Sequence, residues 1–235
     1  NSIVFGLNEL FDLEMTKEEM IFISQKAEHD FVQVKCGIMD QYASMFGEEN
    51  SAILLDCRSL ESTIFPIDFK DYEILLINSN VTHSLAESAY NDRRQVCEKI
   101  AALLQVRALR DVTQEALKSI QNQLTQEDYL KGLNVLEENE RVLEASVALK
   151  ENDLKQFGKL LFDSHNGLQH QYKVSCTELD FLVELAKQDT NVLGARMMGG
   201  GFGGCTINLV SKEHVSAFKR KVEQLYENKF SEKCS

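Results

Sequence analysis

A glycine-rich stretch near the carboxyl end of the chain is the first candidate for chemistry. Six of the twelve glycines lie between Gly194 and Cys205, and an apolar run, CTINLV, begins at Cys205. Glycine adopts positive φ without a Cβ clash, and its backbone can closely approach another chain or a phosphate. The four glycines among the six residues from Gly199 to Gly204 therefore predict a tight loop with exposed backbone, which either contacts a ligand or forms a hairpin that serves folding alone.

This stretch also contains a formal match to a dinucleotide-binding motif. Gly199, Gly201 and Gly204 satisfy G-x-G-x-x-G. The motif needs a strand before it and a helix opening directly from it, so that a pyrophosphate meets the helix N-terminus. Here the expected order is loop, strand and then a helix over 213–228. A Rossmann-type site is therefore excluded, and the sequence holds no G-x-x-x-x-G-K-[ST] motif.

A second candidate is the run CGIMDQ at residues 36–41. The pattern predicts a short helix over 38–46 that Gly37 opens and Gly47 ends, which places Asp40 in the first turn. The helix macrodipole and the free N–H groups there favour a charged carboxylate. Such a residue can orient a substrate hydroxyl and accept its proton, or it can simply stabilise its own helix.

A third candidate combines NSNVTHSL at residues 78–85 with YNDRR at residues 90–94. The spacing predicts that Arg93 and Arg94 lie on a solvated helix face and pair with Glu98 one turn later. We favour this interpretation over one in which the two arginines bind a phosphate.

The histidines and cysteines predict no metal site. His83 and His165 have no sequence neighbours that would make them ligands or bases, so we interpret both as structural. The six cysteines form no C-x-x-C pair and have no zinc-like spacing to the five histidines. This usage is typical of reduced thiols in a cytoplasmic protein.

The composition limits the partners that the chain can have. A length of 235 residues, 43% of them hydrophobic and 26% charged, fits one large or two modest soluble domains. The net charge of −12 argues against nucleic acid, because phosphate backbones need a surface of Lys and Arg. No apolar run approaches the roughly 18 residues of a membrane span, so no membrane partner is expected.

The elements that must position these residues point to an α+β fold. The sequence has one proline and many Leu, Glu, Lys and Gln windows, which favours helices. Helices are predicted over 3–13, from a capping box at 16–19, and over 38–46, 84–104, 113–124, 127–149, 152–172, 177–187 and 213–228. Strands are predicted over 52–56, 62–67, 72–78 and 205–210, with antiparallel pairing because polar turns separate the first three. Helices and strands are segregated rather than alternating, with a domain boundary near 69–71.

Taken together, these motifs resemble the galactokinases of the GHMP small-molecule kinase superfamily. The matching runs occur in the same order along nearly the whole chain. They are 36–41, 78–85, Tyr90 with Arg93 and Arg94, and 194–206, with weaker echoes at 164–165 and 174–180.

The resemblance implies a fold, an activity and a set of site residues. Residues 1–70 would be the C-terminal part of an N-terminal α+β lobe, and residues 71–235 a C-terminal domain with an antiparallel sheet and flanking helices. The implied reaction transfers the γ-phosphoryl group of ATP to the anomeric hydroxyl of galactose. Asp40 would be the catalytic carboxylate, and Gly37 and Tyr90 would contact the sugar. The glycines of the third motif would lie against the nucleotide; they are Gly199, Gly200, Gly201, Gly203 and Gly204.

Two departures from the family pattern limit what this chain is expected to do. Met198 stands where the family usually has Thr, which removes a hydroxyl from the loop. The family's first two motifs have no match here. The first supplies an arginine partner for the catalytic Asp, and the second is the loop that binds the triphosphate and helps to position Mg²⁺. We therefore expect a fragment that is inactive alone, with most Mg²⁺ ligands outside it.

Three alternatives stay open on sequence grounds. The first is a kinase for a related sugar such as N-acetylgalactosamine or arabinose. The second is a galactokinase-like sensor that binds galactose and ATP without turnover. The third is an α+β domain whose glycine hairpin is purely structural. The sequence gives no indication of oligomeric state.

Overall fold

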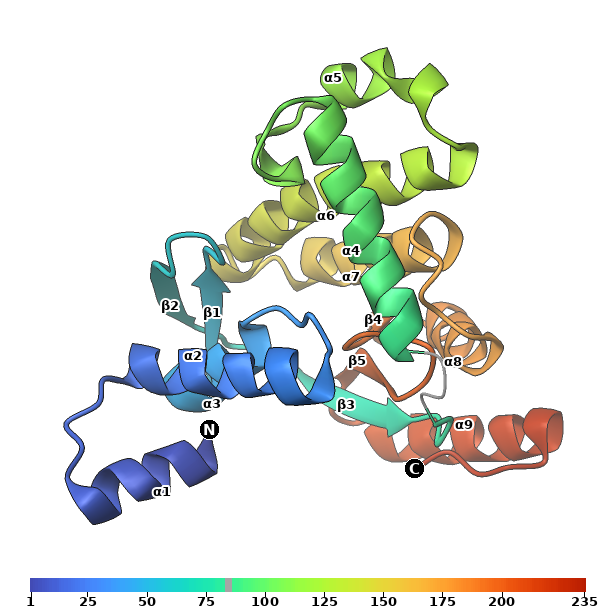
Figure 1. Ribbon diagram of the computed structural model, residues 1–235. Coiled ribbons are helices and arrows are strands. Elements are labelled where there is room, and N and C mark those ends of the chain that lie inside the picture. Colours follow the sequence, from blue (N-terminus) through green and yellow to red (C-terminus); the bar gives the residue numbers. More distant parts are fainter. Residues whose placement is uncertain (83–85) are drawn as a thin grey trace. The chain divides into compact units, whose positions relative to one another are not determined.

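The computed structural model describes residues 1–82 and 86–235, without the side chains of residues 86–90 (Figure 1). The described chain forms two compact units, Asn1–Asp68 and Phe69–Ser235. Each unit combines helices with its own antiparallel sheet. The predicted α+β class is confirmed.

The first unit places three helices ahead of a β-hairpin. Thr16 and Glu19 cap the second helix reciprocally, as predicted: the Glu19 N–H donates to Thr16 Oγ1 at 3.2 Å, and the Thr16 N–H donates to Glu19 Oε2 at 2.8 Å. The elements are α1 (Ser2–Phe11), α2 (Lys17–Ala27) continuing into a π-helical turn (Glu28–Val32), α3 (Met39–Phe46), β1 (Ser51–Leu55) and β2 (Ser62–Pro66).

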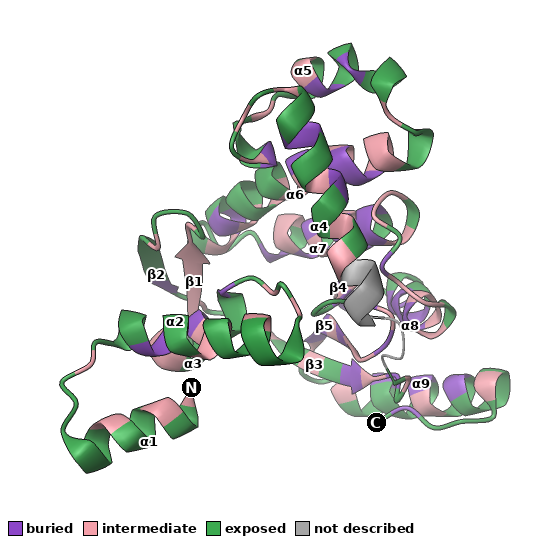
Figure 2. Ribbon diagram, in the orientation of Figure 1, coloured by how far each residue is buried: buried purple, intermediate pink, exposed green. Residues whose placement is uncertain are grey.

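A small core in this unit fixes one face of α3. Ile21, Ile38 and Tyr42 are buried together, and the Tyr42 ring stacks on Phe46 with centroids 4.4 Å apart. The Tyr42 hydroxyl donates to Ser62 Oγ at 2.9 Å, which ties the helix to β2. In contrast, α1 buries no residue (Figure 2).

The second unit is built on a three-stranded sheet of order β3-β5-β4. Both pairings are antiparallel, so β5 is the central strand. The elements are β3 (Tyr72–Asn78), α4 (Ala86–Leu103), α5 (Gln114–Ser119), α6 (Gln126–Lys150), α7 (Leu154–His170), α8 (Thr177–Lys187), β4 (Val192–Met197), β5 (Cys205–Ser211) and α9 (Val215–Phe230), with 3₁₀ turns at Leu109–Asp111 and Gln121–Gln123.

Three apolar clusters lie among the described residues of this unit, and the smallest contains Val174 and Leu179. The main one packs the sheet against α8 and α9 around Val210, Leu182 and Tyr226. Figure 2 shows buried residues along both helices. A second cluster joins α4, α5 and α6 around Ile100 and Leu117, both fully buried. The helical layer and the sheet layer therefore each have an apolar core.

The sequence analysis missed one strand and one pairing. β4 lies directly before the glycine loop, where we predicted no strand. Position 194 in this strand requires glycine because α7 packs closely against it. A Cβ at Gly194 would lie 2.2 Å from the carbonyl oxygen of Gly158. The predicted runs 52–56 and 62–67 do pair antiparallel, whereas β3 pairs with β5.

A buried carboxylate joins α9 to the turn before β4. Asp189 is 8% exposed and accepts hydrogen bonds from Lys221 Nζ at 3.0 Å and from the Asn191 N–H at 3.2 Å. His214 Nε2 lies 3.4 Å away. Burial alone would raise the pKa of Asp189, but the hydrogen bonds from Lys221 and Asn191 outweigh it and lower the pKa to about 2.

This pKa predicts how the stability of the second unit depends on pH. The folded pKa lies below the unfolded value of about 3.9, so the ionised carboxylate stabilises the fold above about pH 4 and loses that effect as the pH falls towards 2. We expect Asp189→Asn to lower the free energy of unfolding by on the order of 2 kcal/mol at pH 7. Urea unfolding of the parent and the variant measures this difference in the free energy of unfolding. The half-exposed Asp163, which forms an ion pair with Lys159 on the same helix, provides the control Asp163→Asn. A loss for Asp189→Asn that stayed constant from pH 7 to pH 2.5 would contradict this account.

Candidate functional site

The first unit presents Asp40 on the free face of α3. Ile38 and Tyr42 are buried. Residues two positions apart on a helix point in roughly opposite directions, so Asp40 lies away from this core and is exposed. No other described residue forms a hydrogen bond or ion pair with its carboxylate. The predicted position of Asp40 in the first turn is confirmed, and the carboxylate is free to accept a proton from a ligand.

The segment before α3 is held by its backbone. His29 Nε2 lies 2.9 Å from the carbonyl oxygen of Cys36, and Gln25 Nε2 donates to the same oxygen at 3.4 Å. A Cβ added at Gly37 would meet nothing within 4 Å. The packing of this unit therefore does not require glycine at position 37.

The Cys36 thiol beside this segment is a poor nucleophile. Burial raises its pKa, and the negative charges of Glu28 and Asp40 raise it further, against a lowering contact from Gln41. The thiol therefore stays protonated at neutral pH.

The second unit presents the glycine loop, residues 198–204, between β4 and β5. The Met198 N–H donates to the Cys205 carbonyl at 3.0 Å and closes the loop at its base. Four glycines have positive φ: Gly199, Gly201, Gly203 and Gly204. Phe202 shares this conformation at φ 60°. The predicted tight loop is confirmed.

Two neighbouring segments hold this loop through backbone contacts. The Phe202 N–H donates to the carbonyl oxygen of Val174 at 2.7 Å, and the Gly204 N–H donates to that of Val81 at 3.4 Å. A Cβ at Gly201 would lie 2.0 Å from the Val174 oxygen, and one at Gly203 would lie 2.5 Å from the Val81 oxygen. Folding alone therefore requires glycine at 201 and 203.

The tip of the loop is different. Met198, Gly199 and Gly200 are exposed, and a Cβ on either glycine would meet nothing within 4 Å. The N–H groups of Gly199 and Gly200 donate to no other described residue. Gly200 also lacks the positive φ that Gly199 has. Its backbone is available to a ligand, and packing gives no reason for glycine there.

The NSN part of the third motif serves this loop. Ser79 is fully buried, and both its N–H and its hydroxyl donate to the carbonyl oxygen of Gly204, at 2.9 and 2.8 Å. Tyr226 donates from its hydroxyl to the Ser79 carbonyl at 2.7 Å. Asn80 Nδ2 donates to the carbonyl of Lys233 at 2.7 Å. Sequence reasoning singled out this motif without finding its role, because the partners lie more than 120 residues away.

The arginine pair has two different environments. Arg94 pairs with Glu98 at 2.9 Å on an exposed helix face, as predicted. The same prediction is wrong for Arg93, whose side chain is only 13% exposed and donates to the carbonyl oxygens of Tyr172 and Lys173. Tyr90 belongs to α4, and its side chain lies outside the described residues. His83 lies outside them as well.

His165 is a core residue, as expected. It is 4% exposed, its Nδ1 accepts the Met197 N–H at 3.2 Å, and its Nε2 lies 3.3 Å from Asp180 Oδ1. Both side chains line a cavity of about 360 Å³ between α7 and α8. None of the predicted site residues lines this cavity.

The part of the chain that the structure describes shows neither a metal cluster nor a membrane span. There, no group of three or more His, Cys, Asp or Glu side chains could hold a metal ion. No described helix has the length and apolar character needed to cross a bilayer. All six cysteines are free thiols.

Comparison with known proteins gives this geometry a family. Residues 1–48 match the GHMP kinases N-terminal domain, and residues 145–228 match the GHMP kinases C-terminal domain. A galactokinase of Thermotoga neapolitana is 44% identical over 226 residues, which is 96% of this chain. The chain belongs to the GHMP kinase family.

Relatives of this GHMP kinase chain extend beyond the region that it matches. The chain spans 63% of the Thermotoga protein. A human galactokinase is 41% identical over 87% of this chain, which corresponds to 52% of its own length. The crystal structure of Lactococcus lactis galactokinase complexed with galactose matches with a TM-score of 0.93 and 36% identity, covering 99% of this chain and 61% of that one.

The two roles of glycine in the loop can be separated by substitution. Gly201→Ala combines a positive φ with a backbone clash, so we expect it to lower the free energy of unfolding by about 2 kcal/mol or more. The matched control is Gly200→Ala, which we expect to stay within about 0.5 kcal/mol of the parent. Urea unfolding of residues 1–235 measures both. Equal losses at the two positions would refute this assignment.

Proposed function

We propose that this GHMP kinase chain is part of a galactokinase, an enzyme that uses ATP to convert galactose into galactose 1-phosphate. The observation that carries the proposal is the similarity to galactokinases at 41–44% identity over most of the chain. The galactose-bound Lactococcus lactis enzyme supports the choice of sugar. Residues 1–70 then belong to an N-terminal lobe, and residues 71–235 form the C-terminal domain.

Asp40 is the proposed proton acceptor. In this reaction the anomeric oxygen of galactose bonds to the γ-phosphorus of ATP, the bond to the β,γ-bridging oxygen breaks, and ADP leaves. The proton of the sugar hydroxyl passes to Asp40. The exposed carboxylate, with no competing hydrogen bond among the described residues, suits that task. We propose that Gly37 contacts the sugar through its backbone and Tyr90 through its phenol.

The glycine loop is the proposed contact with the nucleotide. Gly199, Gly200, Gly201, Gly203 and Gly204 are the proposed nucleotide-binding residues, and the exposed tip at 199–200 has the free N–H groups that fit a phosphorylated ligand. No cluster of three or more His, Cys, Asp or Glu side chains that could hold a metal ion occurs among the described residues, and we propose that most Mg²⁺ ligands belong to the part of a galactokinase that this chain does not match. The free thiols fit the cytoplasm, which we propose as the location.

Activity provides the direct test of the proposed function. We compare residues 1–235 with an extended chain that adds the part of the Thermotoga neapolitana galactokinase that this chain does not match. Phosphoryl transfer depends on positioning and on charge stabilisation that this chain supplies only in part. We expect ATP-dependent phosphorylation of galactose by the extended chain and none by residues 1–235 alone.

The same assay separates the alternatives. Higher kcat/KM for N-acetylgalactosamine or arabinose than for galactose would identify a related sugar kinase. Binding of galactose and ATP without turnover by the extended chain would identify a sensor. Steady turnover by purified residues 1–235, free of host kinase, would overturn the division of the site between this chain and the rest of a kinase.

Asp40 can be tested in the extended chain with a matched acid as control. We expect Asp40→Asn to bind galactose and to lower kcat by about 10²–10⁴-fold, the usual contribution of a positioned general base. Glu48 is an exposed acid just beyond the end of the same helix, so Glu48→Gln should leave kcat unchanged. If Asp40→Asn kept more than about a third of kcat, Asp40 would not be the essential base.

A further inference from the structure

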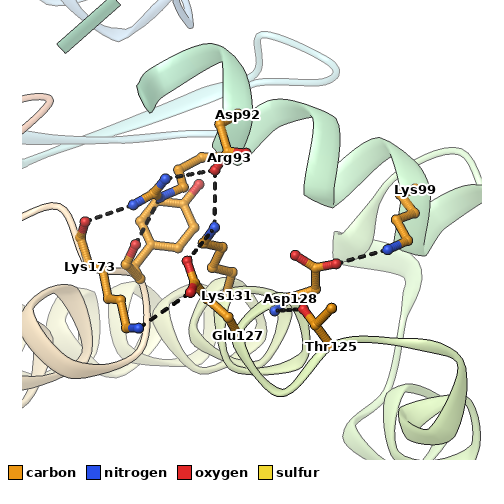
Figure 3. Close-up of polar contacts among 9 residues, drawn as sticks. Asp92, Arg93, Lys99, Thr125, Glu127, Asp128, Lys131 and Lys173 are labelled. Carbon is orange, nitrogen blue, oxygen red and sulfur yellow. Dashed lines mark hydrogen bonds and ion pairs between the residues drawn. The ribbon is translucent and has the colours of Figure 1, made fainter. Parts of the chain in front are cut away.

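The Arg93 side chain is used entirely inside the second unit. Its Nε donates to the carbonyl oxygen of Tyr172 at 2.9 Å, its Nη2 to that of Lys173 at 2.8 Å, and its Nη1 to Asp92 Oδ2 at 2.7 Å (Figure 3). The planar guanidinium thus joins α4 to the segment between α7 and α8. Lysine could not reproduce this geometry, because its single ammonium cannot reach two successive carbonyls and a carboxylate with the same fork.

The orientation of Arg93 is fixed by a buried ammonium. Lys131 of α6 is 4% exposed and donates to Asp92 Oδ2 at 3.0 Å, and it pairs with Glu127 Oε1 at 2.9 Å (Figure 3). Hydrogen bonding by Lys131 lowers the pKa of Asp92, so the carboxylate stays charged between Lys131 and Arg93. Two helices therefore hold the guanidinium in place.

The segment that Arg93 holds is the one on which the glycine loop rests. Val174, the next residue after Lys173, accepts the Phe202 N–H at 2.7 Å through its carbonyl oxygen. The Phe202 side chain packs against the cluster that contains Val174. The same carbonyl excludes any side chain at Gly201. A small shift of Val174 would therefore alter the loop directly.

We propose that Arg93 is a positioning residue for the glycine loop. Through the carbonyls of Tyr172 and Lys173 it fixes Val174, and through Val174 it fixes the backbone of Gly201 and Phe202. The consequence for nucleotide binding rests on the function proposed above, whereas the consequence for loop geometry does not. Arg93 contacts no substrate in this scheme.

Hydrogen exchange in residues 1–235 tests the loop geometry. We expect Arg93→Lys to speed exchange of the Phe202 amide at least about tenfold, because charge-assisted contacts to the segment are lost. The adjacent Arg94→Lys, which changes only the pair with Glu98, should leave that amide unchanged. The amides of Ile207 and Leu209 in β5 report global opening and should stay within about threefold of the parent in both variants.

Two results would overturn the inference. One is Phe202 exchange in Arg93→Lys that equals that in Arg94→Lys. The other is acceleration of Ile207 and Leu209 by the same factor as Phe202, which would make Arg93 a general stabiliser of the fold.

Kinetics of the extended chain separate this inference from the proposed function. We expect Arg93→Lys to raise KM for ATP at least about threefold while KM for galactose stays unchanged. If Phe202 loses protection and KM for ATP does not change, the positioning role stands and the nucleotide role of the glycine loop fails.

Discussion

The approach of the Val174 carbonyl to the glycine loop is the contact on which the candidate site in the second unit depends. The Phe202 N–H is satisfied there, and the space beside Gly201 is filled by the same oxygen. A buried backbone donor and a backbone acceptor are costly to leave unpaired, so this contact constrains both partners. The conformation of the loop is therefore fixed only if the conformation of residues 172–174 is fixed as well.

This constraint divides the glycines by role. Gly201 and Gly203 have positive φ and backbone neighbours that leave no room for Cβ, so packing accounts for them. Gly200 and Gly37 have open space and ordinary φ, so packing does not. A purely structural hairpin explains the first pair and leaves Gly200 unexplained. Gly37 and Gly200 are therefore compatible with the ligand contacts proposed for them, and packing gives no reason for glycine at either position.

Local patterns in the sequence were sufficient for the helices but not for all contacts. The capping box at Thr16 and Glu19 and the first-turn position of Asp40 follow from neighbouring residues, and both were predicted correctly. Strand β4 was missed because Gly194 weakens the strand pattern in the sequence. Glycine is needed at this position because of the contact with Gly158 on α7, which lies 36 residues earlier in the chain.

The error at Arg93 has the same origin. The spacing of Arg93 and Arg94 to Glu98 describes a helix face, and it is correct for Arg94. What distinguishes Arg93 is a pair of carbonyls about 80 residues away, which no local spacing encodes. The roles of Ser79 and Asn80 were hidden in the same way. Candidate residues could be found from motifs, whereas their division into ligand-facing and structural groups needed the tertiary contacts.

The charges around the loop bear on how an acidic chain could bind a phosphorylated ligand. The chain carries a net charge of −12. Arg93 donates from Nε, Nη1 and Nη2 to protein oxygens, and Lys131 is held between two carboxylates. Neither cation is free to act as a phosphate clamp without breaking the contacts that hold the 172–174 segment.

A phosphorylated ligand at the loop would therefore meet the N–H groups of Gly199 and Gly200 rather than these two side chains. Backbone donors suit that task because they carry no mobile charge and are oriented by the loop itself. In the inference proposed above, Val174 and Arg93 fix the backbone of Gly201 and Phe202, which follows these two glycines directly. Under the proposed function, the two cations would contribute to recognition by fixing the backbone, and formally neutral groups would contact the ligand.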